Sequence, residues 1–179
     1  MACTLIPVSP ELRPRLPTIV GNVDYQILRQ RLEQIDELLR ASGVERAFME
    51  RALTGWLARG SRRPSAQQQA KFQERSRRAL RCTLLRTLLQ EDYRGFSCAL
   101  AGSPLYQWFC GMDALDQVCV PSKSELQRYA HWLEAEPMQE LIHSLLRSGV
   151  AHPRKLHLRE AVDLEDYFLD TTCLKANVH

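Results

Sequence analysis

A cationic stretch between Arg59 and Arg81 is the first feature that could do chemistry. Its eight positive residues face a single acid, Glu74, and they are Arg59, Arg62, Arg63, Lys71, Arg75, Arg77, Arg78 and Arg81. Clustered cations bind a phosphate backbone and gain affinity by releasing condensed counterions. We therefore predict DNA contacts here, from Arg59, Arg62, Arg63, Lys71, Arg75 and Arg78. The alternative is a solvated helix face beside a basic loop.

Residues 122–148 have the pattern of two helices joined by a short link, a helix-turn-helix-like pair that we expect to pack closely. Ser122 and Glu125 form an S-x-x-E capping box at its start. In a DNA-reading pair the second helix enters the major groove, yet the second helix here offers few typical DNA-binding side chains. We therefore predict DNA contacts from Lys123 and Arg128 of the first helix. The side chains of this pair by themselves favour a structural helical hairpin over a DNA-reading helix-turn-helix.

A carboxylate near the C-terminal end of the sequence, Asp170, follows the strand-like run 167–169. A strand fixes such an oxygen in place, and the end of the strand exposes it. Mg²⁺ prefers oxygen ligands and needs only a few carboxylates, because it keeps several waters. Asp170 is therefore a candidate metal ligand, and an aspartate that begins an ordinary turn is the alternative.

The elements that must position these residues are mostly helical. Residues 1–22 contain four prolines and are predicted to form an extended arm. Apolar residues at helical spacing predict helices from about 27 to 39, 44 to 58 and 65 to 90. Glycine is predicted to end the first at Gly43 and to break the third at Gly95.

Further helices are predicted around 96–100, from Pro104 to Gly111, and in the pair at 122–148, which Gly149 is expected to close. Residues 151–165 form a predicted link with some β character, and 166–179 form a predicted β-hairpin. The predicted fold class is thus mainly α, with a multi-helix domain at 23–150 and first strands within 151–179.

Composition limits the partners of this chain. The 45% apolar content supports a packed core, and the formal net charge of +3 is small, so any nucleic-acid site must depend on local charge. The six cysteines are scattered without a C-x-x-C pair, which argues against zinc. No apolar run has the length of a membrane span, and no secretory signal is evident. We expect a cytoplasmic protein with reduced thiols and no membrane partner.

Two segments together resemble bacterial insertion-sequence transposases of the DDE superfamily. The segment LYQWFCGMDALDQVCVPSKSELQRYAHWL, residues 105–133, has an aromatic-Phe-x-Gly turn, an acidic residue, Val-Pro and a Ser-capped helix. The segment FLDTTCLKANVH, residues 168–179, resembles the first catalytic strand of that family. The resemblance covers about residues 95–179. The helices predicted at 23–90 resemble that family only in their general helical character.

This resemblance implies the start of an RNase H-like catalytic domain near residue 163, with Asp170 as its first catalytic, metal-binding carboxylate. In such enzymes three acids hold two Mg²⁺ ions that support DNA cleavage and strand transfer. We can assign only one of the three acids. We therefore expect a truncated transposase that is inactive alone and does not bind Mg²⁺ tightly. Its expected partners are transposon-end DNA and, through self-association, full-length transposase.

Two other classes of protein stay open. One is a non-catalytic helical DNA-binding regulator, and the other is a helical protein-interaction module without a nucleic-acid partner. Salt-sensitive DNA binding would separate the first class from the second, because phosphate contacts weaken steeply with ionic strength.

Overall fold

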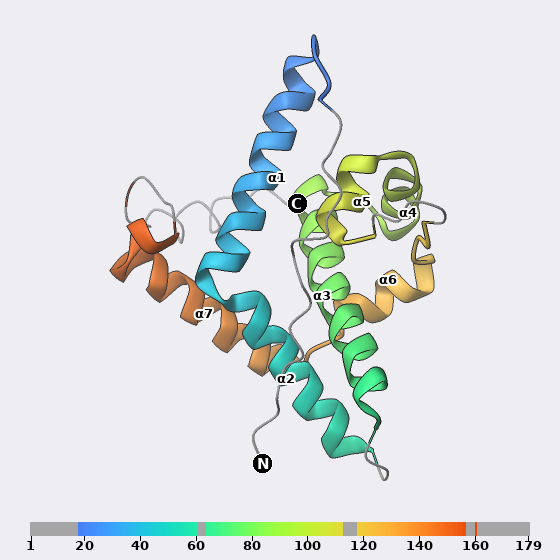
Figure 1. Ribbon diagram of the computed structural model, residues 1–179, viewed down its shortest axis with the longest axis vertical. Coiled ribbons are helices and arrows are strands. Elements are labelled where there is room, and N and C mark those ends of the chain that lie inside the picture. Colours follow the sequence, from blue (N-terminus) through green and yellow to red (C-terminus); the bar gives the residue numbers. More distant parts are fainter. Residues whose placement is uncertain (1–17, 61–63, 113–117, 157–159, 161–179) are drawn as a thin grey trace, which may run out of the picture.

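Figure 1 shows the computed structural model, which describes residues 18–60, 64–112, 118–156 and Glu160. Within them the chain forms seven α helices and one 3-10 turn: α1 (Val23–Ser42), α2 (Val44–Arg59), α3 (Ala66–Leu89), α4 (Tyr93–Gly102), α5 (Pro104–Cys110), α6 (Lys123–Ala130), α7 (Ala135–Ala151) and η2 (Pro153–Leu156). The predicted mainly α fold is confirmed for this part of the chain. The predicted hairpin at 166–179 and most of the arm at 1–22 lie outside the described residues.

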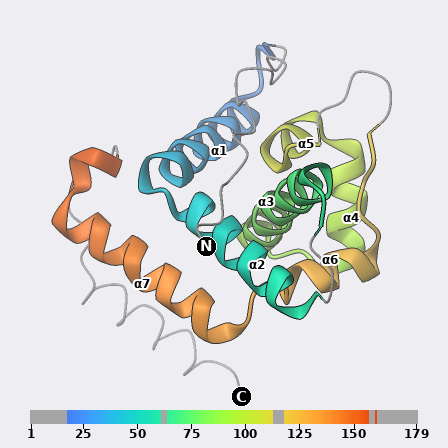
Figure 2. The same ribbon diagram turned by 60° about the horizontal axis from the view of Figure 1, so that its bottom comes forward.

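Helix α3 lies at the centre of the molecule. It packs against α2, α5 and α6, while α1 contacts α2, α5 and η2. Figure 2 shows α1 and α2 on one side of α3, and α4, α5 and α6 on the other. The main core contains Leu32 of α1, Leu85 of α3, Phe96 of α4 and Phe109 of α5. The basic N-terminal half of α3 is thus held in a fixed place by its apolar C-terminal half.

Local sequence signals explain most helix ends. Gly43 has φ 69° and ends α1, and this left-handed backbone suits glycine because it has no Cβ. Ser65 caps α3 and forms a reciprocal capping box with Gln68. Ser103 caps α5, with Pro104 at its first position. Helix α3 runs without a break to Leu89, as the prediction for 65–90 requires.

Two glycine predictions are wrong. Helix α3 ends at Gln90, which has φ 56°, and Gly95 lies inside α4 instead. The reason is Asp92, whose side chain accepts hydrogen bonds from the backbone N–H groups of Arg94 and Gly95 and so starts a new helix earlier. Gly149 is buried within α7, which continues to Ala151.

The predicted close pairing of the two helices at 122–148 is also wrong. Helix α6 packs on α3 and α4, whereas α7 packs on α2 and η2. Figure 2 shows α6 and α7 diverging from their link. The link itself explains this, because Trp132 donates a hydrogen bond to Ser76 Oγ in α3 and Leu133 packs against a second small core around Phe48 of α2. These contacts anchor the turn and send the two helices to different partners.

The segment after α7 was predicted as a link with β character. Its first residues form η2 instead, and η2 packs against α1 and α7 with Leu156 buried. The helical body therefore extends at least to residue 156.

The capping box of α6 gives a test of this local structure. We predict that Ser122→Ala lowers the free energy of unfolding by about 1 kcal/mol, because the Glu125 N–H loses the hydroxyl that accepts its hydrogen bond. Ser124→Ala is the matched control, since the Ser124 hydroxyl caps nothing and is exposed. Urea denaturation of both variants measures the difference, and equal stability of the two would contradict the assignment.

Candidate nucleic-acid interface

A hollow between the end of α2, the first half of α3 and one face of α6 is the best candidate site. We call it the basic groove, and its volume is about 820 Å³. The residues that line it are Arg59, Phe72, Ser124, Gln127, Arg128, His131 and Trp132. Among the residues that the structure describes, this lining includes two arginines and a histidine but no carboxylate. Its charge therefore favours an anionic ligand.

Helix α6 contributes one stripe of side chains to the basic groove. Ser124, Gln127, Arg128 and His131 follow the spacing i, i+3, i+4 and i+7, which places them on one face of a helix. All four are exposed, and within the described part of the chain their side chains make no hydrogen bond or ion pair. The opposite face of α6 buries Leu126 and Tyr129. The stripe is thus held outward and is open to a ligand.

The two aromatic rings in the floor of the groove, Phe72 and Trp132, belong to a larger stack of rings. The Phe72 ring lies between Trp56, with 4.4 Å between ring centroids, and Trp132, at 5.5 Å. The Arg75 guanidinium lies over the Trp132 ring, 5.5 Å from its centroid. This stack joins α2, α3 and the α6–α7 link, so it fixes the three walls of the groove relative to one another.

The only acid of α6, Glu125, is occupied elsewhere. One oxygen accepts a hydrogen bond from Arg75 at 3.3 Å, and the other accepts the backbone N–H of Ser122 at 3.3 Å. These contacts hold the Glu125 carboxylate away from the stripe on α6. They also mean that Arg75, one of the predicted DNA contacts, is partly neutralised in the folded chain.

The structure brings together two of the predicted DNA contacts, Arg59 of α2 and Arg128 of α6, in the lining of the basic groove. Lys71 and Lys123 are exposed, but they lie outside the groove lining. Arg78 is half-buried and donates hydrogen bonds to Glu74 and to the Gly111 carbonyl, which makes it a structural residue. Arg62 and Arg63 lie outside the described residues.

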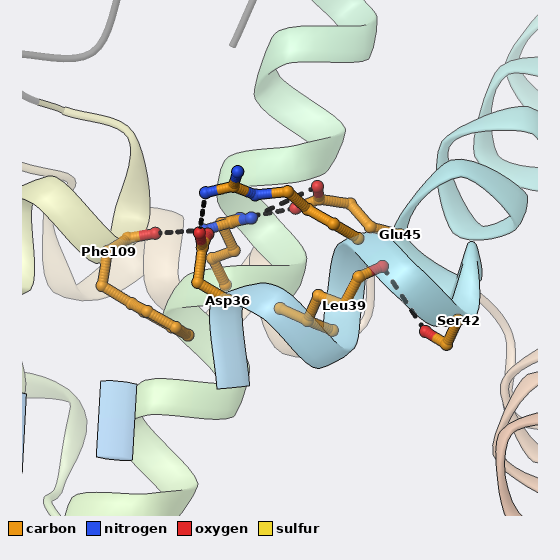
Figure 3. A network of polar contacts seen from close by, with 7 residues as sticks. Asp36, Leu39, Ser42, Glu45 and Phe109 are labelled. Carbon is orange, nitrogen blue, oxygen red and sulfur yellow. Dashed lines mark hydrogen bonds and ion pairs between the residues drawn. The ribbon is translucent and has the colours of Figure 1, made fainter. Parts of the chain in front are cut away.

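One member of the cationic stretch is a core residue. Arg81 is 1% exposed, and its guanidinium contacts Glu45 at 2.5 Å, Asp36 at 2.6 Å and the Phe109 carbonyl at 2.9 Å. Figure 3 shows Asp36, Glu45 and Phe109 meeting from α1, α2 and α5. Asp36 also pairs with Arg40. The stretch 59–81 is therefore not one continuous DNA-binding surface, because its last turn points into the protein.

The charge state of Arg81 follows from these partners. Burial by itself lowers the pKa of a guanidinium, but the hydrogen bonds and charges of Glu45 and Asp36 outweigh it and raise the pKa of Arg81 above its ordinary value. Arg81 is thus a permanent cation in the core. It ties α3 to α1, α2 and α5.

A second hollow, of about 620 Å³, lies between α2 and the α6–α7 link. It shares Arg59, His131 and Trp132 with the basic groove. Its rim differs because it carries the carboxylates of Glu50, Glu134 and Glu140. The mixed charge makes it a poorer site for a polyanion than the basic groove.

The predicted metal ligand, Asp170, lies outside the described residues, and so does the Mg²⁺ site that the resemblance implies. Among the residues that the structure describes, no three His, Cys, Asp or Glu side chains gather closely enough to hold a metal ion. In the same residues, no helix combines the length and the hydrophobicity needed to cross a bilayer.

Sequence reasoning identified the cations of the basic groove but missed Ser124, Gln127 and His131 as site residues. Their helical spacing on one face of α6 was visible in the sequence. What the sequence did not show is that α2 and α3 would form the opposite wall.

Comparison of the chain with protein-family models, with curated proteins and with solved structures gave no match.

Proposed function

We propose that the helical body is a DNA-binding domain of an insertion-sequence transposase and that the basic groove binds the DNA backbone. The single observation that supports this most is the lining of the groove, which among the described residues includes both Arg59 and Arg128 and no carboxylate. Guanidinium groups donate paired hydrogen bonds to phosphate oxygens and keep their charge at all physiological pH values.

The assignment to transposition rests on the resemblance of residues 105–133 and 168–179 to DDE transposases. In this proposal the helical body binds transposon ends and associates with full-length transposase, while Asp170 serves a Mg²⁺-dependent catalytic domain. The structural support concerns the DNA-binding step, because Asp170 lies outside the described residues. The described residues that line the groove come from helices α2, α3 and α6 and the turn after α6.

Salt dependence tests the DNA-binding step. Arg59, Arg128, Lys71 and Lys123 are exposed cations on or near the basic groove. If Arg59, Lys71 and Lys123 each neutralise one phosphate, a salt increase from about 50 to about 200 mM weakens binding roughly 40-fold, because log K falls with a slope of about −0.9 per phosphate. Fluorescence anisotropy of a labelled duplex measures this. Absence of binding at low salt, or binding that salt does not weaken, would contradict the proposal.

A further inference from the structure

We propose that α6 is a base-reading helix, in which Gln127 and Arg128 recognise base edges while Arg59 holds the phosphate backbone across the groove. The inference rests on the proposed DNA-binding function and adds the residues that determine sequence preference. It assigns base reading to α6, the first helix of the pair predicted at 122–148.

The first argument is availability. The side chains of Gln127 and Arg128 are exposed and make no hydrogen bond or ion pair within the described residues. Glutamine binds adenine through N6 and N7, and arginine binds guanine through O6 and N7, in both cases with two hydrogen bonds. These are the two side-chain types best suited to reading purines in the major groove, and here they are adjacent on one helix.

The second argument is rigidity. Base reading requires a helix whose position is fixed before DNA arrives. Helix α6 is fixed at its start by the capping box of Ser122 and Glu125, and on its buried face by Leu126 and Tyr129. The Arg75–Glu125 ion pair ties it to α3 as well. The exposed stripe is therefore presented from a firmly packed base.

The third argument is the shape of the site. A hollow of about 820 Å³ separates the stripe on α6 from Arg59 at the end of α2. A helix that enters the major groove needs space beside it for the sugar-phosphate backbone and a cation beyond that space. The basic groove supplies the space, and Arg59 supplies the cation. Its Nε donates to the Gly55 carbonyl, which holds the guanidinium in place.

The aromatic floor argues for duplex DNA rather than unpaired bases. Proteins that bind single strands stack bases on exposed ring faces. Here Phe72 lies between Trp56 and Trp132, and Arg75 lies over Trp132. The rings that line the groove are thus occupied by one another and by Arg75. They shape the floor and leave recognition to the polar stripe.

Selection from a pool of short duplexes with randomised sequence tests the inference. We expect the full chain to enrich a site containing neighbouring purines. Gln127→Ala and Arg128→Lys should each reduce the preference for that site over a scrambled duplex by about 5- to 150-fold, the discrimination of one paired base contact. Lys71→Ala is the comparison variant, and it should weaken both duplexes equally because it contacts backbone only.

The outcomes separate the inference from the proposed function. Salt-sensitive binding without any sequence preference would overturn base reading by α6 and leave backbone binding intact. A preference that survives both Gln127→Ala and Arg128→Lys would also overturn it. Failure to bind any duplex would overturn both proposals. Far-UV circular dichroism confirms that each variant folds, which we expect because all three side chains are exposed.

Discussion

An Arg81→Ala variant will lose about 3–5 kcal/mol of unfolding free energy, the usual effect of removing one partner from a buried ion pair. Arg81 is 1% exposed, and its removal leaves Asp36 and Glu45 without their main partner inside the protein. The Phe109 carbonyl loses a donor as well. Because natural domains have only about 5–15 kcal/mol of stability, this loss should be visible as a large shift in a urea denaturation curve.

A surface arginine provides the control. Arg46 forms an exposed i,i+4 pair with Glu50, and Arg46→Ala should cost no more than about 0.5 kcal/mol. A triple variant, Arg81→Met with Asp36→Leu and Glu45→Leu, should recover much of the loss, because it leaves no unpaired charge in the core. An Arg81→Ala variant as stable as Arg46→Ala would contradict the role of Arg81.

The double variant Arg59→Ala with Arg128→Ala should bind duplex DNA roughly 100-fold more weakly at low salt. The reason is the loss of two charge-assisted contacts of about 1.5 kcal/mol each. The dependence of log K on log salt should also become shallower by about 1, because Arg59 contacts a phosphate whereas Arg128 contacts a base. Fluorescence anisotropy titrations at several salt concentrations give both quantities.

The matched control for that experiment removes two arginines elsewhere. Arg46 of α2 and Arg147 of α7 are exposed and do not line the basic groove. Their double alanine variant has the same net charge as the groove variant. Equal weakening by both variants would show that overall charge controls binding, and would remove the special role of the groove.

Much of the helical framework could be predicted because it depends on local chemistry. The capping Ser122 with Glu125, the Ser103-Pro104 start and the left-handed Gly43 each act within a few residues of their own position. Helical spacing of apolar residues likewise predicts helices without knowledge of their partners. These features set the limits of α2, α3 and α5 to within a residue or two, whereas α1 begins at Val23, ahead of its predicted start at about 27.

Features that depend on distant partners could not be predicted in the same way. In the sequence, Arg81 is the last cation of the stretch 59–81. It is a core residue because it pairs with Asp36 and Glu45, which lie 45 and 36 positions earlier in the chain. Trp132 bonds to Ser76, 56 positions away, and so separates α6 from α7. The basic groove has the same origin, since Arg59 and Arg128 line one hollow only after α2, α3 and α6 have packed.

Photo-crosslinking tests the central claim, that DNA lies in the basic groove against α6, most directly. A photoreactive amino acid would replace Gln127 in one protein and His143, an exposed residue of α7, in another. Each protein would be irradiated with a labelled duplex at low salt. We predict a covalent adduct from position 127 and none from position 143. An adduct from position 143 alone would place the DNA on α7 and contradict the account.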